Sequence, residues 1–539
     1  MSGSITLENR FGVNKMELIS LKYAIFVIVL LVLYYCFPKK YRWYVLLAGS
    51  MAYYVIICKW YVLFIIFTIC TTYGSTIWID KLLKEQNAIV KSHKEDWDRQ
   101  TRKEYKEKGR KKRVAVMLFA LLCNFGILAF LKYIPYAGEL GLLLPLGISF
   151  YTFQSMGYVM DVYREIVEPE KNFLKVALFV SFFPQIIQGP IAIYDKFAGQ
   201  LYEGHSLRLE NLQKGALLVL WGVMKKLVIA DRAVNIINFV MDKPMDFSGT
   251  YVFFAAVVYA LQLYADFSGG IDIVRGIAEM FGITMSTNFN HPYFSRSLTE
   301  YWHRWHMTLG DWCRNYIFYP LSISKRFLNF GKWLKPRFGA HISKVLPGCI
   351  ASVITFIVIG VWHGANMKYL YFGLWNGIVI MLAELFAPVN KKVAGGFFKL
   401  TGLREKGIFA TIVSVLWTFM LILVGYYFDI AANASTAFHM LFKSVTDFHI
   451  SELGINNIIL NLGACGLDEY DILLLIICTL LWFFISFVEE NKKLDMRDFI
   501  LSRKLPLRWA IIYLGIFIVI IFGYYGPGVN PADFVYMQF

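Results

Sequence analysis

The 539 residues of this chain have the composition of a membrane protein: 57% are hydrophobic, 17% aromatic and only 17% charged, whereas a soluble domain carries about 25% charged residues. The net charge of +16 does not indicate nucleic-acid binding. Its Lys and Arg residues lie between apolar runs, where anionic lipid and the charge bias of cytoplasmic loops account for them.

Apolar runs long enough to cross a hydrocarbon core of about 30 Å recur along the chain. The clearest lie at 23–37, 43–57, 61–79, 114–131, 213–230, 250–264, 346–361, 369–387, 408–428, 471–488 and 509–525. They predict an all-α polytopic membrane protein with about 11–13 transmembrane or re-entrant helices. The first run lacks a basic segment before it and does not end in small residues, so we expect it to remain a span and not a cleaved signal.

Loop charge predicts the orientation. Residues 91–113 contain eleven Lys or Arg against five Asp or Glu, and residues 325–344 contain six Lys or Arg and no acid. Both segments are therefore expected on the cytoplasmic side. Counting spans from these segments places the C-terminus outside the cytoplasm and the joint at 362–368 away from the basic loops.

Between 132 and 320 the apolar pattern is interrupted by Pro135, Pro145, Pro184, Pro190, Gly147, Gly189, Gly269 and Gly270. We expect broken helices there. Irregular backbone at membrane depth is tolerated only where protein or a water-filled cavity satisfies its polar groups. These breaks therefore predict a lined cavity.

A first polar segment, residues 301–306 (Tyr-Trp-His-Arg-Trp-His), continues to Asp311, Arg314 and Asn315. The spacing of Trp302, Trp305 and Leu309 predicts one continuous helix. Two interpretations are open: an aromatic interfacial anchor, or a site in which a histidine performs chemistry.

A second polar segment, residues 360–366 (Gly-Val-Trp-His-Gly-Ala-Asn), ends an apolar run. His363 is either a satisfied core residue or a base, because burial favours the neutral imidazole that accepts a proton from a hydroxyl. We expect the small residues Gly360, Gly364 and Ala365 to leave room for a substrate.

Other motifs are weaker. Asp266 lies inside an apolar stretch and is either functional or a cap at a helix break, and Asp161 with Arg164 has the spacing of a structural ion pair. No G-x-S-x-G, P-loop or G-x-G-x-x-G motif occurs, so a serine hydrolase, an ATP-driven pump and a dinucleotide enzyme have no support. The cysteines form no C-x-x-C pair, and we expect no metal site.

A series of motifs resembles the membrane-bound O-acyltransferase (MBOAT) family, especially the bacterial cell-envelope branch of alginate and peptidoglycan O-acetyltransferases and D-alanyl transfer proteins. The motifs are Leu144–Gln154, Phe183-Pro184-Gln185, Gly189-Pro190, Asp266–Gly269, Asn288-Phe289-Asn290, Arg304-Trp305-His306 and Trp362–Asn366.

The resemblance implies a ring of helices around a central tunnel, with His363 as the central catalytic residue and His306 as its partner. His303 occupies no family motif position and is left out of this pair. Further residues are expected to bind substrate or line the tunnel: Trp305, Trp362, Asn366, Asp266, Gln154 and Asn290.

The chain ends in Phe534-Val-Tyr536-Met-Gln-Phe539, which resembles the terminal Phe-x-Tyr-x-x-Phe element of this branch. The resemblance implies that Tyr536 receives the acyl group as an ester. An aromatic interface anchor is the alternative.

We therefore expect an extracytoplasmic segment at 1–20, a catalytic core at 21–390 with a basic cytoplasmic loop at 81–113, C-terminal membrane helices at 391–527 and an extracytoplasmic tail at 528–539. The Lys and Glu content of 81–113 predicts that this loop is helical and solvated. The expected enzyme is a multi-pass protein of the bacterial cytoplasmic (inner) membrane. It holds no bound cofactor and uses acetyl-CoA or another acyl thioester, which leaves acetyl and D-alanyl donors both open. Its partners are an SGNH-type transferase, an exported polysaccharide or peptidoglycan, and membrane lipid. Alternatives are a polysaccharide or lipid-linked sugar transporter and a lipid O-acyltransferase.

Overall fold

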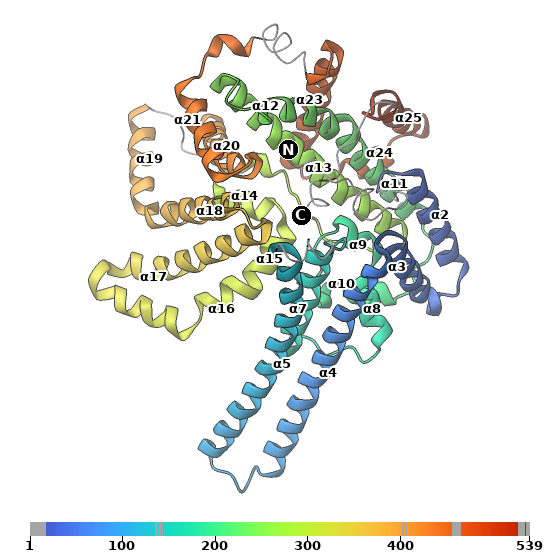
Figure 1. Ribbon diagram of the computed structural model, residues 1–539, viewed down its shortest axis with the longest axis vertical. Coiled ribbons are helices and arrows are strands. Elements are labelled where there is room, and N and C mark those ends of the chain that lie inside the picture. The colour runs from blue at the N-terminus through green and yellow to red at the C-terminus, as the bar shows by residue number, and fades with distance from the viewer. Residues whose placement is uncertain are drawn as a thin grey trace. The chain divides into compact units, whose positions relative to one another are not determined.

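In the computed structural model, every regular element of the described residues is a helix (Figure 1). The structure describes residues 18–134, 144–401, 407–454 and 465–526, together with Gly138, Leu142, Arg404 and Phe534. The chain divides into two compact units, residues 1–219 with 273–286 and residues 220–272 with 287–539. The expectation of an all-α polytopic protein is confirmed.

The first unit is built on helices of the N-terminal part of the chain. They are α2 (Leu21–Cys36), α3 (Arg42–Cys58), α4 (Val62–Ser92), α5 (Arg99–Tyr133), α7 (Ile148–Tyr163), α8 (Phe173–Ser181), α9 (Phe183–Gln188) and α10 (Tyr194–Tyr202). Helices α4, α5 and α7 pack against one another. The buried side of α7 is polar as well as apolar, because it carries Gln154, which donates to the carbonyl of Phe179.

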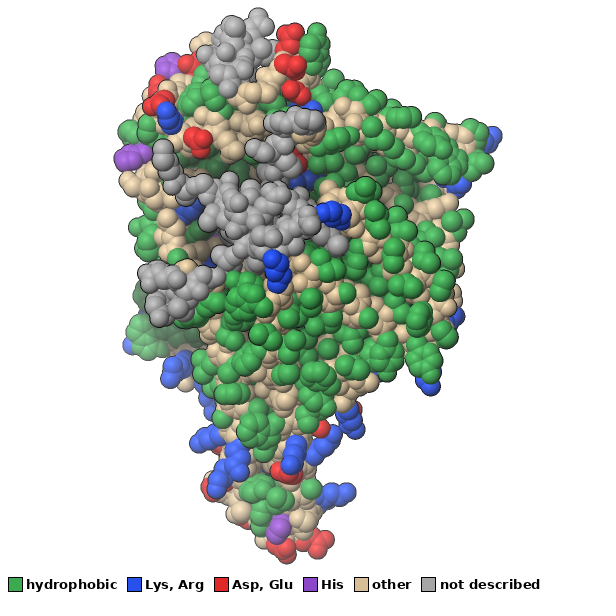
Figure 2. Space-filling view, turned by 45° about the vertical axis from the view of Figure 1, so that its right-hand side comes forward, with side chains coloured by type: hydrophobic (Ala, Val, Ile, Leu, Met, Phe, Trp, Pro, Cys, Tyr) green, Lys and Arg blue, Asp and Glu red, His purple; other side chains and the backbone are tan. Residues whose placement is uncertain are grey.

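Helices α4 and α5 form a long hairpin whose far end is charged (Figures 1 and 2). Figure 2 shows Lys and Arg side chains gathered at this end and a hydrophobic surface on the neighbouring helices. The side chains at the end are exposed, as for Lys81 and Arg110. The prediction of a solvated helical segment at 81–113 is thus confirmed.

The second unit contains the C-terminal helices. They are α12 (Asp231–Met241), α13 (Gly249–Met280), α14 (Leu298–Arg304), α15 (Met307–Cys313), α16 (Tyr319–Ser322), α17 (Lys325–His363), α18 (Met367–Leu385), α19 (Ala387–Thr401), α20 (Ile408–Ile430), α21 (Ala434–Thr446), α23 (Glu469–Lys492), α24 (Met496–Leu501) and α25 (Leu505–Phe522). Helix α11 (Leu209–Met224) leads into this unit through a π-helix at Lys225–Ala230. Side chains from this π-helix and from α12, α13, α20, α21 and α23 form one apolar core.

Among the described residues, seven helical segments are long and apolar enough to cross a membrane, or eight if the bent pair α18–α19 is one span. All eleven predicted apolar runs fall on helices: the runs at 23–37 and 509–525 extend just past α2 and α25, and the run at 369–387 crosses the bend between α18 and α19. The expected 11–13 counted transmembrane and re-entrant helices together. The seven segments leave out shorter apolar helices such as α2, whose 16 residues are fewer than the roughly 20 that a span needs, and they count α3 and α4 as one segment, Lys39–Ser92.

Several predicted helix breaks are present. Helix α7 starts after Gly147, which has a left-handed φ of 70°, and α9 begins with Pro184 in its first turn. The prediction of a break at Gly269 and Gly270 is wrong, because α13 runs through both. A Cβ at Gly269 would lie 2.9 Å from the carbonyl oxygen of Gly222. Gly269 therefore allows α13 and α11 to pack closely and does not bend the helix.

Candidate functional site

His306 lies in a tight turn between α14 and α15. Its φ of 43° and ψ of 51° are left-handed, which is uncommon for a residue other than glycine and costs about 1–3 kcal/mol. The prediction of one helix through Trp302, Trp305 and Leu309 is wrong, because Trp305 is extended and the helix restarts after His306. The interfacial-anchor interpretation also fails for the second half of the motif: Trp305 is 6% exposed and His306 2%.

The segment Asn288–Asn290 braces this turn. The carbonyl of Asn288 accepts from the amide of Met307 at 3.0 Å, and the amide of Asn290 donates to the carbonyl of Arg304 at 3.0 Å. These two backbone bonds enclose the strained residue from both sides. The motifs Asn288–Asn290 and Arg304–His306 therefore act together: their hydrogen bonds hold the backbone of His306 in its left-handed conformation.

The side chain of Asn288 fixes the tautomer of His306. Its Oδ1 accepts from the backbone amide of Thr308 at 3.0 Å and from the Thr308 hydroxyl at 2.9 Å. The same oxygen is 3.3 Å from Nδ1 of His306, so this ring nitrogen must carry a proton. Burial and the neighbouring His363 lower the pKa of His306, in its turn between two short helices, to about 3. The ring is therefore neutral near pH 7, and its Nε2 is an acceptor.

His363 is the last residue of α17 and lies among aromatic rings. The ring centroids are 5.0 Å from Trp362, 5.4 Å from Phe372 and 6.0 Å from Tyr369. The expectation that Gly360 and Gly364 leave room for substrate is wrong. A Cβ at Gly360 would lie 2.3 Å from the carbonyl oxygen of Tyr369, and one at Gly364 would lie 2.5 Å from its ring.

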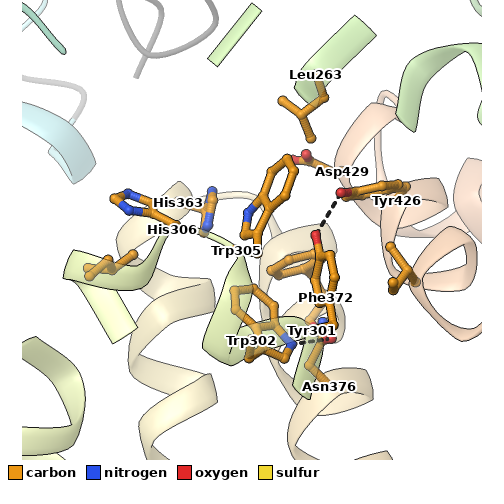
Figure 3. A pocket seen from close by; sticks show the side chains of 12 residues that line it. Leu263, Tyr301, Trp302, Trp305, His306, His363, Phe372, Asn376, Tyr426 and Asp429 are labelled. Atoms are coloured by element: carbon orange, nitrogen blue, oxygen red, sulfur yellow. Dashed lines mark hydrogen bonds between the residues drawn. The ribbon is translucent and has the colours of Figure 1, made fainter. Parts of the chain in front are cut away.

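His306 and His363 line the same pocket (Figure 3). The pocket has a cavity volume of about 30 Å³, and its other lining residues are Leu263, Tyr301, Trp302, Trp305, Leu309, Phe372, Asn376, Ile422, Tyr426 and Asp429. In Figure 3 both histidines lie on the same side of Trp305. His303 is exposed and does not line the pocket, which agrees with its exclusion from the predicted pair.

Polar groups that the sequence reasoning missed complete the pocket. The hydroxyls of Tyr301 and Tyr426 are 2.7 Å apart, and Trp302 Nε1 donates to Asn376 Oδ1 at 3.0 Å (Figure 3). The carboxylate of Asp429 accepts from the hydroxyl of Tyr259 at 2.7 Å. Asn376 could have been found from the sequence, since an amide inside the apolar run 369–387 is costly unless it has a purpose.

Three further predicted site residues of the second unit, Trp362, Asn366 and Asp266, are not among the residues that line this pocket. Trp362 is adjacent to it, with its ring 6.4 Å from that of His306. Asn366 caps α18 by accepting from the amide of Lys368. Asp266 does not line the pocket: it is completely buried and paired with Lys226 at 2.7 Å.

The other two predictions fall elsewhere. Gln154 belongs to the first unit, where its side chain accepts from Gln185. Tyr536 lies outside the described residues.

Fold and site together define a class: an α-helical, multi-pass membrane protein with two histidines from separate segments in one buried aromatic pocket. Residues 169–335 match the model of MBOAT, the membrane-bound O-acyltransferase family, so this segment of the chain is similar to that family. The matched segment includes His306 and ends before His363.

The chain is also similar to several named bacterial proteins. It is 30% identical to the "Probable alginate O-acetylase AlgI" of Pseudomonas syringae pv. tomato over 58% of this chain and 54% of the relative. It is 30% identical to the "Peptidoglycan O-acetyltransferase" of Helicobacter pylori over 51% and 56%, and 26% identical to the "Teichoic acid D-alanyltransferase" of Bacillus subtilis over 52% and 67%. The alignments with the first two relatives span just over half of their length.

Proposed function

We propose that this chain is a membrane O-acyltransferase that takes an acyl group from a cytoplasmic thioester and passes it across the membrane for O-acylation of an exported cell-envelope polymer. One observation carries the proposal: His306 and His363, 57 positions apart in the sequence, line one pocket together. A pair of imidazoles in a pocket lined largely by aromatic rings suits proton transfer more than it suits transport of a polar polymer.

The proposed reaction is a single acyl transfer. His363 takes the proton of an acceptor hydroxyl while the hydroxyl oxygen attacks the thioester carbonyl carbon. The C–S bond then breaks, and the departing thiolate takes the proton back from His363 to leave as a thiol. General base catalysis typically supplies about 10²–10⁴-fold, so orientation of the two reactants must supply the rest.

His306 has a narrower role in this scheme. Because Nδ1 donates to Asn288, Nε2 accepts hydrogen bonds and cannot donate one to the negative oxygen that develops on the thioester carbonyl. We therefore assign His306 to hold a donor hydrogen in place, either that of the acceptor hydroxyl or that of the His363 ring. The neutral state of His306 preserves this role near pH 7.

The donor we propose is acetyl-CoA, and the first acceptor is the hydroxyl of Tyr536. A tyrosyl ester is a carrier form, from which an extracytoplasmic SGNH-type partner would transfer the acetyl group to the polymer. The similarity to proteins named for alginate, peptidoglycan and teichoic acid supports a polymer acceptor.

The direct test replaces His363 by Ala. The variant should be present in membranes at the wild-type level while the exported polymer loses its O-acyl groups. His303→Ala is the matched control, since His303 is exposed, and should leave acylation unchanged. Full acylation in the His363→Ala strain would refute the proposal.

The same strain separates the rival functions. A polysaccharide or lipid-linked sugar transporter would stop exporting polymer when inactivated, whereas an acyltransferase would still export polymer without ester groups. A lipid O-acyltransferase would leave polymer esters intact and change the membrane lipids instead.

A further inference from the structure

The pocket that contains the two histidines also contains a carboxylate. Asp429 lines it together with His306 and His363, and in Figure 3 the carboxylate and the two imidazoles are arranged around the indole ring of Trp305. The cavity volume is about 30 Å³, which is enough for about two water-sized groups. An occupant of so small a space that contacts the histidines therefore lies in the electric field of Asp429 as well.

Asp429 occupies a position that local rules disfavour. It lies in the last turn of α20, where the helix dipole is negative and an acidic side chain is unfavourable. Helix α20 is also one of the apolar segments long enough to cross a membrane, and an ionisable group in such a segment is costly. Departures of this kind from local preference are expected at functional sites.

The neighbouring cation, Lys368, stabilises the end of α20 and leaves the carboxylate to the pocket. Its Nζ donates to the backbone carbonyls of Asp429 and Ala431, at 2.7 Å each. The carboxylate of Asp429 accepts instead from the neutral hydroxyl of Tyr259 at 2.7 Å. Asp429 lines the pocket and Lys368 does not. The pocket therefore has a negative charge in its wall, and the ammonium that offsets the helix end lies outside it.

We propose that Asp429 is a specificity-determining residue that excludes acyl groups carrying a negative charge, so that the enzyme accepts short, uncharged acyl groups. The inference rests on the proposed function, in which the acyl group of a thioester enters this pocket. A lining of aromatic rings screens the repulsion between two carboxylates less than bulk water does. An acyl group that ends in a carboxylate is repelled by Asp429, whereas an acetyl group carries no charge and fits the small cavity.

The test compares acetyl-CoA with malonyl-CoA, whose acyl group ends in a carboxylate. Butyryl-CoA, which is similar in length to malonyl-CoA but uncharged in its acyl group, controls for size. Membranes that contain the full-length protein are incubated with each thioester, the release of free CoA is followed, and His363→Ala membranes give the background. Asp429→Asn removes the charge and keeps an oxygen that accepts from Tyr259. Tyr259→Phe removes this hydrogen bond and keeps the charge.

Asp429→Asn should raise kcat/KM for malonyl-CoA relative to acetyl-CoA by about tenfold or more, because the repulsion between like charges is gone. The ratio for butyryl-CoA relative to acetyl-CoA should stay at the wild-type value, since the shape of the pocket is kept. Asp429→Glu and Tyr259→Phe should both still discriminate against malonyl-CoA. An unchanged malonyl-to-acetyl ratio in Asp429→Asn, or an equal loss of discrimination in Tyr259→Phe, would overturn the proposal.

Alkylation of His363 separates this inference from the proposed function. The protein is treated with bromoacetate or with the uncharged bromoacetamide, and the alkylated peptides are quantified by mass spectrometry, with the exposed His303 as internal reference. The preference of His363 for bromoacetamide should fall by about tenfold or more in Asp429→Asn, and that of His303 should stay the same. If wild type shows no His363-dependent release of CoA from any thioester, the proposed function fails, and the alkylation still decides whether Asp429 repels anions. An equal preference at His363 in wild type and Asp429→Asn would overturn the inference.

Discussion

Asn288 offers the sharpest perturbation of the site, because one carbonyl oxygen organises three buried donors. It accepts from the Thr308 amide, the Thr308 hydroxyl and His306 Nδ1. Replacing Asn288 by Ala leaves these donors without their acceptor, and each such loss costs about 1–3 kcal/mol before relaxation. Allowing for partial relaxation, we expect the free energy of unfolding to fall by about 2–4 kcal/mol. Activity should fall by about 10–100-fold, since the His306 ring is no longer oriented.

Asn288→Asp is the matched variant that tests the charge state alone. A carboxylate keeps the acceptor for all three donors, but its negative charge favours the imidazolium and raises the pKa of His306. Acyl transfer in this variant should therefore approach the wild-type rate at mildly alkaline pH and fall steeply as the pH decreases. The assay is transfer of label from acetyl-CoA in membranes across a pH series. A pH profile identical to wild type in Asn288→Asp, or full activity in Asn288→Ala, would refute the assignment of a neutral, oriented His306.

Two further predictions concern stability. Because the pKa of His306 is lowered from 6.5 to about 3, the unfolded chain takes up the proton first as the pH falls. His306 thus contributes stability that is fully present above pH 6.5 and is lost progressively toward pH 3, by about 1.4 kcal/mol per pH unit. In thermal unfolding in detergent, His306→Gln should show a shallower pH dependence in this window; an unchanged slope would contradict the buried neutral ring. Gly360→Ala should destabilise the α17–α18 pair by about 1–3 kcal/mol. Gly348→Ala should be neutral or stabilising, because no atom lies within 4 Å of a Cβ built there. Equal melting temperatures for the two variants would contradict the close contact at Gly360.

Much of the fold could be predicted from hydropathy alone. Apolar runs must become helices in a membrane, since no other open structure satisfies the backbone there, and all eleven predicted runs are helical. The helical nature of the basic segment 81–113 followed from its Lys and Glu content. The number of spans could not be derived in the same way, because a run of 16 or 17 apolar residues, as in α2 and α3, is compatible with both a short span and a packed helix.

The histidine pair was predictable as residue types, but its geometry was not. Periodicity favours a helix through Trp302 and Trp305, and no local rule predicts a left-handed residue at His306. That conformation depends on backbone bonds from Asn288 and Asn290, which lie 18 and 16 positions before His306 in the chain. The predictions for Gly269 and Gly360 were wrong for a related reason. Both glycines allow a neighbouring helix to approach closely, and the sequence of one helix does not show which helix packs against it.

Strain at His306 and the buried charges on α13 have a common explanation. A left-handed histidine persists only where its surroundings over-determine it, so the wall against which its ring packs must itself be immobile. Phe267 is that wall, at 4.9 Å between ring centroids. The preceding Asp266 pairs with Lys226 at 2.7 Å, and we expect this contact to restrain this turn of α13. The buried ion pair therefore belongs to the site through the rigidity it gives to Phe267, although it contributes no group to the pocket, and loosening it should misplace His306 without removing any residue that touches the substrate.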